Sequence, residues 1–258
     1  MKSLGIVIPL KSEKICSDWL ATCHLLNSTL DSIRNQTSCL QKTVVVCDEI
    51  PVLSEANLKS TSILQLPGEI KSGREFRKPD AIIDKTLKLT YGLKTLMDAG
   101  MDYCMVMDAD DLLHKDLVEF VSKHELANGF VIKDGYEYYS RHHKLVHRTD
   151  LDMMCGSTTI IQREFIVIPE SIDESTIWSN TWGKYSYSQM VSYFEGISRP
   201  LVEIPFPALI YRLDHGGGNL SNEKGNGRNG LKYHCKKAIK IGLLGRSPSE
   251  MQKQNFSL

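Results

Sequence analysis

A short apolar segment that ends abruptly on carboxylates constrains the fold of this chain more than any other feature. Residues 103–107 are apolar throughout, as in a strand that is buried on both faces of a sheet. Asp108, Asp110 and Asp111 follow directly. Open α/β sheets bind their ligands beyond the carboxyl ends of the strands, so the segment predicts a sheet whose binding edge carries these acids.

Clustered carboxylates repel one another, and they therefore usually face either water or a cation. Oxygen ligands suit a hard divalent ion such as Mg²⁺ or Mn²⁺, which one or two carboxylates hold together with phosphates of a substrate. The alternative is a solvated acidic turn in which Asp111 caps the next helix. The acids alone leave both interpretations open.

Composition excludes several classes of protein. The 258 residues suffice for one sizeable domain, and 41% hydrophobic with 24% charged residues is typical of globular proteins. With 31 basic and 31 acidic residues the net charge is zero, so no overall field attracts nucleic acid. Seven scattered cysteines without a CxxC pair indicate reduced thiols and a cytoplasmic protein. No apolar run reaches the length of a membrane span.

Two further segments are predicted to be strands of the same sheet. Residues 4–10 are apolar, with Pro9 near the end, where a strand tolerates the missing N–H group. Residues 43–49 again end on acids. Asp48 and Glu49 are therefore candidates to hydrogen-bond a base or a ribose, with ordinary loop acids as the alternative. Because helices separate these strands, the sheet is predicted to be parallel.

A helix predicted from Asp80 to Gly100 carries a candidate ligand for an anion. Its apolar residues repeat with a period of 3.6 residues. Lys85 lies near its start, where backbone N–H groups and the helix dipole favour anions. We expect Lys85 to contact a phosphate or a base. The basic loop 69–79 before this helix is a further candidate, although such charge runs are more often solvated.

The second half of the chain contains three candidate binding segments. A group of aromatic residues is predicted either to form a sugar platform or to pack in the core: Trp178, Trp182, Tyr185, Tyr187 and Tyr193. His215, a candidate metal ligand or a surface histidine, precedes six glycines within residues 216–230, which predict a lid. Residues 231–245 read as a basic amphipathic helix that contacts a membrane surface or an acidic partner, or packs on one side.

In combination, these segments resemble the family-2-like glycosyltransferases of GT-A fold. The resemblance covers residues 4–125 well and the remainder loosely, and four segments carry it: Gly5-Ile6-Val7-Ile8-Pro9, Cys47-Asp48-Glu49, the helix from Asp80, and Asp108-Ala109-Asp110-Asp111. It implies an α/β chain with the GT-A (Rossmann-like nucleotide-diphospho-sugar transferase) fold, in which helices flank a mostly parallel central sheet.

The expected organisation is one continuous domain with three regions. Residues 1–125 form the nucleotide-sugar-binding half, residues 126–230 form the acceptor-side half with the glycine-rich loop, and residues 231–258 form a basic helical tail.

The resemblance implies a metal-dependent glycosyltransferase of the hexosyltransferase class. It would move a sugar from a nucleoside-diphosphate sugar, with a UDP-sugar favoured, to a hydroxyl of a glycan or lipid-linked acceptor. By analogy, the setting is bacterial-type surface polysaccharide synthesis in the cytoplasm, with peripheral contact to the inner face of the membrane through the C-terminal basic helix.

Matching positions assign roles to individual residues. The positions that hold the nucleoside match Pro9, Asp48 or Glu49, and Lys85, with Asp108 near the ribose. The ligands of a Mn²⁺ or Mg²⁺ ion that bridges the two phosphates match Asp110 and His215.

The catalytic base is the point where the sequence departs from the family. An acceptor hydroxyl needs a base, usually Asp or Glu. Inverting members usually carry an acidic pair before the helix that follows the aromatic segment, and no such pair stands here. Asp152, Asp173 and Glu174 are the nearest acids and remain alternatives, which leaves inversion or retention of configuration open.

Two other functions fit parts of the pattern. A sugar nucleotidyltransferase would use a similar sheet and metal, but it usually has a glycine-rich phosphate loop where this chain has Leu10-Lys11-Ser12-Glu13-Lys14. A non-catalytic nucleotide-sugar-binding protein would tolerate the missing base, but it gives no reason for Asp108, Asp110 and His215 to coincide.

Overall fold

The structure, a computed structural model, describes residues 1–68, 78–124, 126–215 and 228–258. The glycine-rich segment after His215 and the basic loop before the helix from Asp80 lie almost entirely outside these ranges. The predictions of a lid and of a phosphate-binding basic loop therefore fall outside the described residues.

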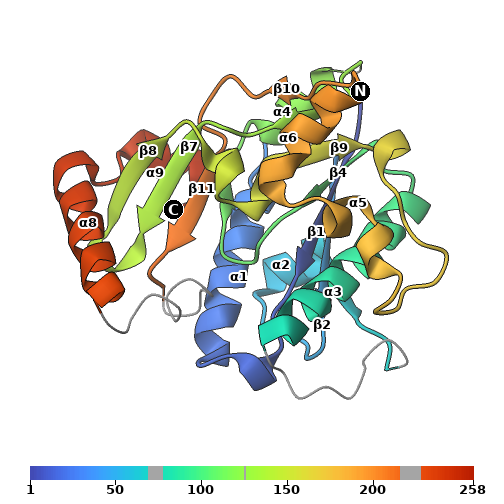
Figure 1. Cartoon of the computed structure of the whole chain (residues 1–258), viewed down its shortest axis with the longest axis horizontal. Coiled ribbons are helices and arrows are strands. Elements are labelled where there is room, and N and C mark those ends of the chain that lie inside the picture. The colour runs from blue at the N-terminus through green and yellow to red at the C-terminus, as the bar shows by residue number, and fades with distance from the viewer. Residues whose placement is uncertain (69–77, 125, 216–227) are drawn as a thin grey trace.

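A seven-stranded sheet forms the centre of the molecule and confirms the predicted α/β class (Figure 1). Its order is β10-β6-β9-β4-β1-β2-β3. β9 runs antiparallel to both of its neighbours, and the other pairs are parallel. In chain order the strands are β1 (Leu4–Pro9), β2 (Gln41–Cys47), β3 (Thr61–Gln65), β4 (Tyr103–Val106), β6 (Gly129–Val131), β9 (Thr159–Gln162) and β10 (Val202–Glu203).

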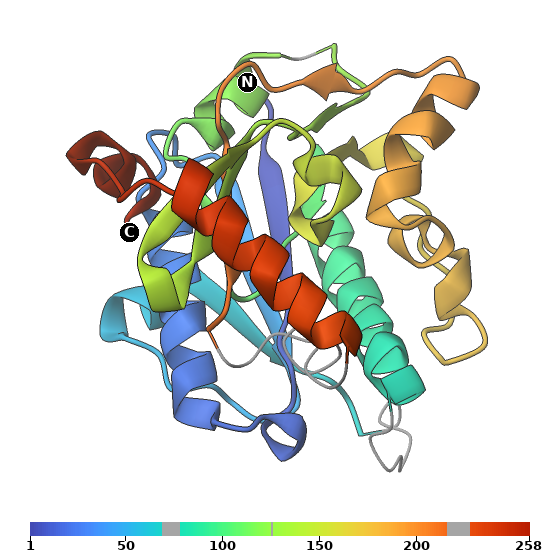
Figure 2. The ribbon, with the colours of Figure 1, turned by 60° about the vertical axis from the view of Figure 1, so that its left-hand side comes forward.

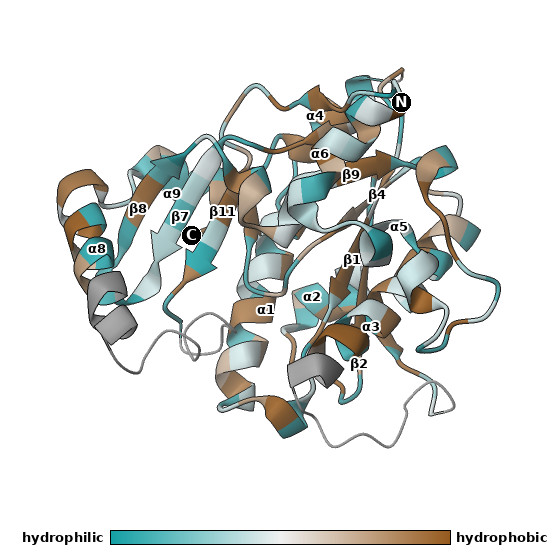
Figure 3. Ribbon diagram, in the orientation of Figure 1, coloured by the Kyte–Doolittle hydropathy of each residue, from teal (hydrophilic) through white to brown (hydrophobic). Residues whose placement is uncertain are grey.

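Helices cover both faces of this sheet because its central strands are apolar on both sides. On β1, Ile6 and Ile8 pack with α1 (Trp19–Arg34) and α4 (Leu117–Lys123), whereas Val7 packs with α3 (Lys78–Asp98) on the other face. Figure 3 shows hydrophobic residues concentrated on these central strands. The remaining helices near this sheet are α2 (Glu55–Ser60), α5 (Thr181–Lys184) and α6 (Tyr187–Gly196).

A second sheet of four strands lies beside the first, with the order β5-β11-β7-β8. It consists of β5 (Leu112–Leu113), β7 (Gly135–Tyr139), β8 (Lys144–Arg148) and β11 (Leu209–Leu213). β7 and β8 form an antiparallel hairpin, and β11 pairs parallel with β7. Because β5 follows the acids at the end of β4 and pairs with β11, the second sheet brings the end of β11 next to those acids.

The C-terminal helices pack on the second sheet. Ile241 of α8 (Arg228–Leu244) is buried with Tyr139 and Val146, and Figure 2 shows α8 crossing in front of the sheets. Phe256 of α9 (Glu250–Phe256) is buried with Leu112 of β5. None of the described helices combines the length and the apolar character that a membrane crossing requires.

Candidate functional site

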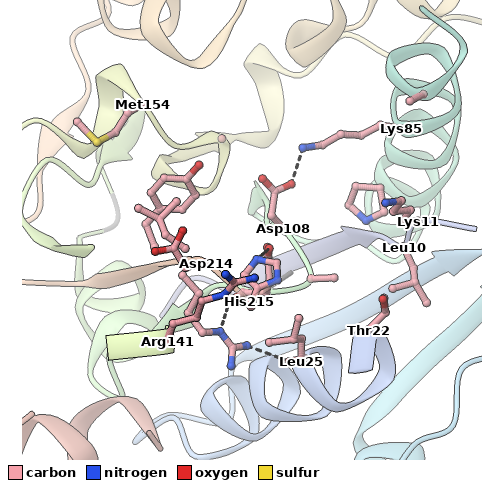
Figure 4. Close-up of a pocket in the computed structure, with 18 of the residues that line it drawn as sticks. Leu10, Lys11, Thr22, Leu25, Lys85, Asp108, Arg141, Met154, Asp214 and His215 are labelled. Atoms are coloured by element: carbon pink, nitrogen blue, oxygen red, sulfur yellow. Dashed lines mark hydrogen bonds and ion pairs between the residues drawn. The ribbon is translucent and has the colours of Figure 1, made fainter. Parts of the chain in front are cut away.

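A cavity of about 740 Å³ lies at the carboxyl ends of β1 and β4, where the two sheets meet. Figure 4 shows Leu10, Lys11 and Thr22 on one side of it and Arg141 and Met154 on the other. Asp108 and His215 lie between the two sides. The lining therefore combines the edge of the parallel sheet, where α/β proteins bind ligands, with residues that the second sheet and α8 supply.

Asp108 and Lys85 meet in this cavity and form an ion pair (Figure 4). The backbone N–H of Asp108 donates to the Ser157 hydroxyl at 2.9 Å, which holds the residue at the end of β4. Partial burial lowers the pKa of the Lys85 ammonium, but the carboxylates of Asp108 and Asp110 more than offset this and raise the pKa above its usual value. Lys85 is therefore a cation at neutral pH.

Asp110 and His215 form the second pair, with 2.7 Å between Oδ2 of Asp110 and Nε2 of His215. Burial raises the pKa of Asp110, but the hydrogen bond and charge of His215, with the charges of Arg212 and Lys85, outweigh it and lower the pKa below its usual value. Asp110 is thus an anion that faces the cavity. The structure brings together two residues that lie more than one hundred positions apart in the sequence.

Asp111 has a structural role behind this pair. Its side chain is fully buried and accepts hydrogen bonds from Ser157 Oγ at 2.5 Å and from the backbone N–H of Arg212 at 3.3 Å. Burial and the charges of Asp110 and Asp108 raise the pKa of Asp111 well above its usual value. Asp111 does not cap a helix, because α4 begins only at Leu117. It fixes the loop after β4 against β11.

Arg212 on β11 is a site residue without a local sequence signal. Its guanidinium donates to the carbonyl oxygens of Asp110 and Leu25 and to the hydroxyls of Ser28 and Thr29. The residue is only 7% exposed. Burial lowers the pKa of Arg212, although Asp110 and Asp111 oppose this shift. Arg212 ties α1 to the loop that carries Asp110.

Lys88, one turn after Lys85 on α3, is a second site residue that sequence reasoning missed. Its ammonium is completely buried and lies 2.6 Å from Oδ2 of Asp48 and 2.7 Å from Oδ2 of Asp84. It also donates to the carbonyl oxygen of Leu10 at 2.9 Å. A charged residue between Leu87 and Leu89, with an acid four positions before it, was the available sequence signal.

The predicted nucleoside ligands divide into two groups. Pro9 and Lys85 line the cavity, as does Asp108. Asp48 and Glu49 are not among the described residues that line it. Asp48 pairs with Lys88, and Glu49 accepts from the Ser12 hydroxyl at 2.9 Å and so fixes the turn after β1.

The three candidate bases lie apart from the described lining of the cavity. Asp152 is largely buried on a 3-10 turn, and burial raises its pKa, with Lys133 opposing. Asp173 accepts hydrogen bonds from Ser175 within its own loop. Glu174 is the neighbour of Asp173 in this loop. The described residues therefore do not assign the role of base to any of them.

The predicted aromatic group is also divided between the protein core and the cavity. Trp182, Tyr185 and Tyr193 pack against the core, and the rings of Tyr185 and Tyr193 stack at 3.9 Å. Trp178 is 43% exposed. Tyr187, at the start of α6, lines the cavity and is the member of the group that can present a flat face to a sugar.

Helix α8 supplies the remaining wall. Lys237 lines the cavity and pairs with Asp214, and Lys240 pairs with Glu137 on β7. Two of the basic side chains of the predicted amphipathic helix therefore point toward the protein. Within the lining, Arg141 from the β7–β8 connection adds another cation.

Asp110 and His215 are the candidate ligands of a divalent metal ion. Among the described residues, no group of three or more His, Cys, Asp and Glu side chains is arranged to hold a metal ion. Asp110 and His215 provide one carboxylate oxygen and one imidazole nitrogen at the cavity surface. Mg²⁺ is commonly held by one or two protein ligands with phosphate oxygens and water, and Mn²⁺ accepts carboxylate and water ligands too, so the pair fits an ion that arrives with a diphosphate.

The sequence matches no protein-family model and no curated protein. Several solved structures resemble the fold. Residues 1–349 of TarS from S. aureus, in complex with UDP, give a TM-score of 0.49 at 12% identity over 98% of this chain and 68% of that chain. A second crystal structure of the same TarS fragment gives a TM-score of 0.46 at 13% identity with the same coverage of both chains. A protein from Desulfovibrio desulfuricans, provisionally described as a nucleotide-diphospho-sugar transferase, gives 0.38 at 9% identity over 94% and 98% of the two chains.

Proposed function

We propose that this protein is a glycosyltransferase that takes its sugar from a nucleoside-diphosphate sugar. The observation that carries the proposal is the pairing of Asp108 with Lys85 and of Asp110 with His215 in one cavity at the carboxyl edge of the sheet. The diphosphate of a donor with a bound divalent metal ion would suit both pairs. Its phosphates would contact Lys85, and the metal ion would contact Asp110.

The residues of this cavity suit the charge that develops in the reaction. Transfer of a glycosyl group builds negative charge on the departing diphosphate, and positive groups in a partly dry cavity stabilise that charge. Lys85 and Lys237 both line the cavity and can donate to phosphate oxygens. A Mn²⁺ or Mg²⁺ ion held by Asp110 and His215 would supply Lewis-acid stabilisation of the same charge. Tyr187 offers a platform for a sugar ring.

We propose for the acceptor a hydroxyl of a glycan or lipid-linked glycan, and for the setting the assembly of a surface polysaccharide on the cytoplasmic side of a membrane. The exposed apolar residues Ile239, Leu243 and Leu244 on α8 support contact with a membrane surface. Exposed Lys236 and Arg246 beside them would favour anionic lipids.

A thermal-shift panel of UDP-, GDP-, CMP- and dTDP-sugars, each with and without Mn²⁺, tests the donor site. A ligand that binds only the folded state raises the unfolding midpoint by mass action, so the donor is detected without knowledge of the acceptor. We expect a shift with at least one nucleotide sugar that depends on Mn²⁺. The absence of any shift at millimolar donor would contradict the proposal.

Slow release of free sugar from the donor, measured in the presence of Mn²⁺ and without an acceptor, separates an enzyme from a binding protein. A transferase hydrolyses its donor slowly when water replaces the acceptor, and EDTA should stop this release. Mn²⁺-dependent binding without any release of sugar would favour the non-catalytic binding protein.

A further inference from the structure

Lys88 organises the end of the cavity next to β1. An ammonium has three N–H donors. Lys88 donates to the carbonyl oxygen of Leu10 at 2.9 Å and to Oδ2 of Asp84 at 2.7 Å, and it forms an ion pair with Oδ2 of Asp48 at 2.6 Å. Lys88 is fully buried among these three groups, so it is not the group that meets a ligand here.

The two carboxylates that share Lys88 differ in where they lie. Asp84 is among the residues that line the cavity, and Asp48 is not. The side chain of Asp84 is 16% exposed. Within the described part of the chain, Lys88 is the only residue that donates to Asp84, and it does so at Oδ2. Among the described residues, none donates to the second oxygen, Oδ1, so this atom can accept a hydrogen bond from a ligand.

The raised pKa of Asp84 is consistent with a carboxylate that has few hydrogen-bond donors around it. Burial raises the pKa of its carboxyl, and the charge and hydrogen bond of Lys88 do not fully offset this effect, so the pKa lies above its usual value. A new N–H donor at Oδ1 would stabilise the carboxylate. An acceptor atom that faced Oδ1 would instead meet a negative charge at close range.

The surroundings of Asp84 suit a flat ring more than a phosphate. Leu10, Ile15, Leu25 and Ala81 line the cavity and give it apolar walls. Figure 4 shows Leu10 to one side of Asp108 and His215, which lie near the centre of the cavity. The diphosphate of a donor that meets Lys85 and Asp110 would thus place its base toward β1.

We propose that Oδ1 of Asp84 accepts a hydrogen bond from the ring N–H of the donor's base and so restricts the donor to uracil, thymine or guanine nucleotides. This inference rests on the proposed function. Uracil and thymine present N3–H, and guanine presents N1–H, whereas cytosine N3 and adenine N1 carry lone pairs that a carboxylate repels. A site that hydrogen-bonds a substrate N–H rejects analogues without it, because its buried acceptor is left unpaired.

Isothermal titration of the wild-type protein with UDP, dTDP, GDP, CDP and ADP, each with Mn²⁺, gives the first test. We expect at least one of UDP, dTDP and GDP to bind about 10- to 100-fold more tightly than CDP and ADP. Equal or tighter binding of CDP or ADP would overturn the inference and leave the proposed function intact. Binding of none of the five would overturn both.

Two isosteric variants then identify the carboxylate. Asp84→Asn places an amide N–H₂ at the base, which can donate to cytosine N3, so the ratio of CDP to UDP affinity should rise about 10-fold or more. Asp48→Asn removes the other carboxylate of Lys88 and is the matched control, because Asp48 does not line the described cavity. In Asp48→Asn the ratio of CDP to UDP affinity should equal that of wild type. An unchanged ratio in Asp84→Asn, or an equal change in both folded variants, would assign selectivity elsewhere.

Discussion

Among single residues, Asp110 gives the clearest test of the site. Asp110→Asn keeps the shape of the side chain but removes the charge that faces His215 at 2.7 Å. Loss of even an outer partner of a metal ligand commonly costs about 10- to 100-fold in metal affinity. We therefore expect the Mn²⁺-dependent part of nucleotide affinity to fall by at least that factor, measured by titration calorimetry.

The control for this variant is Asp31→Asn, which removes an exposed carboxylate that pairs with Arg34 on α1. It should bind nucleotide and Mn²⁺ as wild type does. His215→Ala should weaken the Mn²⁺-dependent term in the same direction as Asp110→Asn. Normal Mn²⁺ dependence in Asp110→Asn would remove Asp110 from the metal site.

Asp102 carries a prediction about stability and pH. Its Oδ2 accepts from the backbone N–H of Ser3 at 2.9 Å and from the Ser3 hydroxyl at 2.8 Å. Burial raises the pKa of Asp102, but these bonds and Lys2 outweigh it and lower the pKa below its usual value of 3.8. A folded pKa below the unfolded one stabilises the protein above pH 3.8, and this contribution is lost as the pH falls through the folded pKa.

Asp102→Asn should therefore be less stable than wild type at pH 7, by about 1 kcal/mol, since the side chain is one-third exposed and solvent weakens its bonds. Urea denaturation at pH 7 and at pH 3 measures the difference, which should shrink at pH 3. Asp98→Asn is the control, because that carboxylate is 68% exposed. If the difference in free energy of unfolding between wild type and Asp102→Asn grew toward low pH, the ionised Asp102 would not be the stabilising form.

Sequence reasoning found the site residues that follow strands, and Lys85 near the start of α3, but it missed Lys88 and Arg212. Asp108 and Asp110 end an apolar run, which makes them visible as a pattern. Lys88 and Arg212 have their roles only because α3 and β11 bring them to partners from distant segments. Asp48 follows a strand as Asp108 does, but it forms an ion pair with the buried Lys88 and does not line the described cavity. No local sequence pattern distinguishes these two aspartates.

At the scale of elements, the contact of α3 with the central sheet depends on Gly92. A Cβ atom at this position would lie 2.2 Å from Cγ2 of Val7 and 2.9 Å from Cγ2 of Val46. Gly92→Ala should therefore push the helix from β1 and β2. Overpacking of this kind commonly costs about 1–3 kcal/mol, which exceeds the roughly 1 kcal/mol that alanine gains in a helix.

Gly242 on α8 is the matched control, because nothing lies within 4 Å of the Cβ that an alanine would add there. Gly242→Ala should raise the free energy of unfolding by about 0.5–1 kcal/mol. Urea denaturation of both variants measures the contrast. Equal stabilisation by the two alanines would show that α3 is not packed as closely as described.

The elements that the sequence predicts are the ones whose patterns are continuous. β1, β2 and β4 are apolar runs that helices cover on both sides, and the structure confirms them. β10 consists of two exposed residues, Val202 and Glu203, at the edge of the sheet. Its pairing with β6 depends on tertiary contact rather than on its own pattern, so sequence periodicity has no means of locating it.

At the scale of the whole molecule, the two sides of α8 differ in their surroundings. Lys237 and Lys240 make ion pairs with Asp214 and Glu137, and Ile241 is buried, so this side belongs to the protein. The opposite side exposes Ile239 at 61% and Leu243 at 69%. Under the proposed function, a helix that is fixed on one side and apolar on the other would hold the cavity near a membrane that carries a lipid-linked acceptor.

Co-sedimentation with vesicles tests this arrangement. We expect the protein to bind vesicles of phosphatidylcholine with phosphatidylglycerol better than vesicles of phosphatidylcholine alone, since each nearby Lys or Arg contributes about 1 kcal/mol at an anionic surface. The double variant Ile239→Ser and Leu243→Ser should weaken binding at least about 10-fold, because each apolar side chain contributes about 1.5–3 kcal/mol when fully buried.

The control is Met251→Ser on α9, which removes an apolar side chain that is 71% exposed but lies outside α8. It should bind the anionic vesicles as wild type does. Donor hydrolysis in solution should be the same in all variants, because neither Ile239 nor Leu243 lines the described cavity. Equal vesicle binding by the double variant and wild type would show that the exposed side of α8 does not contact the membrane.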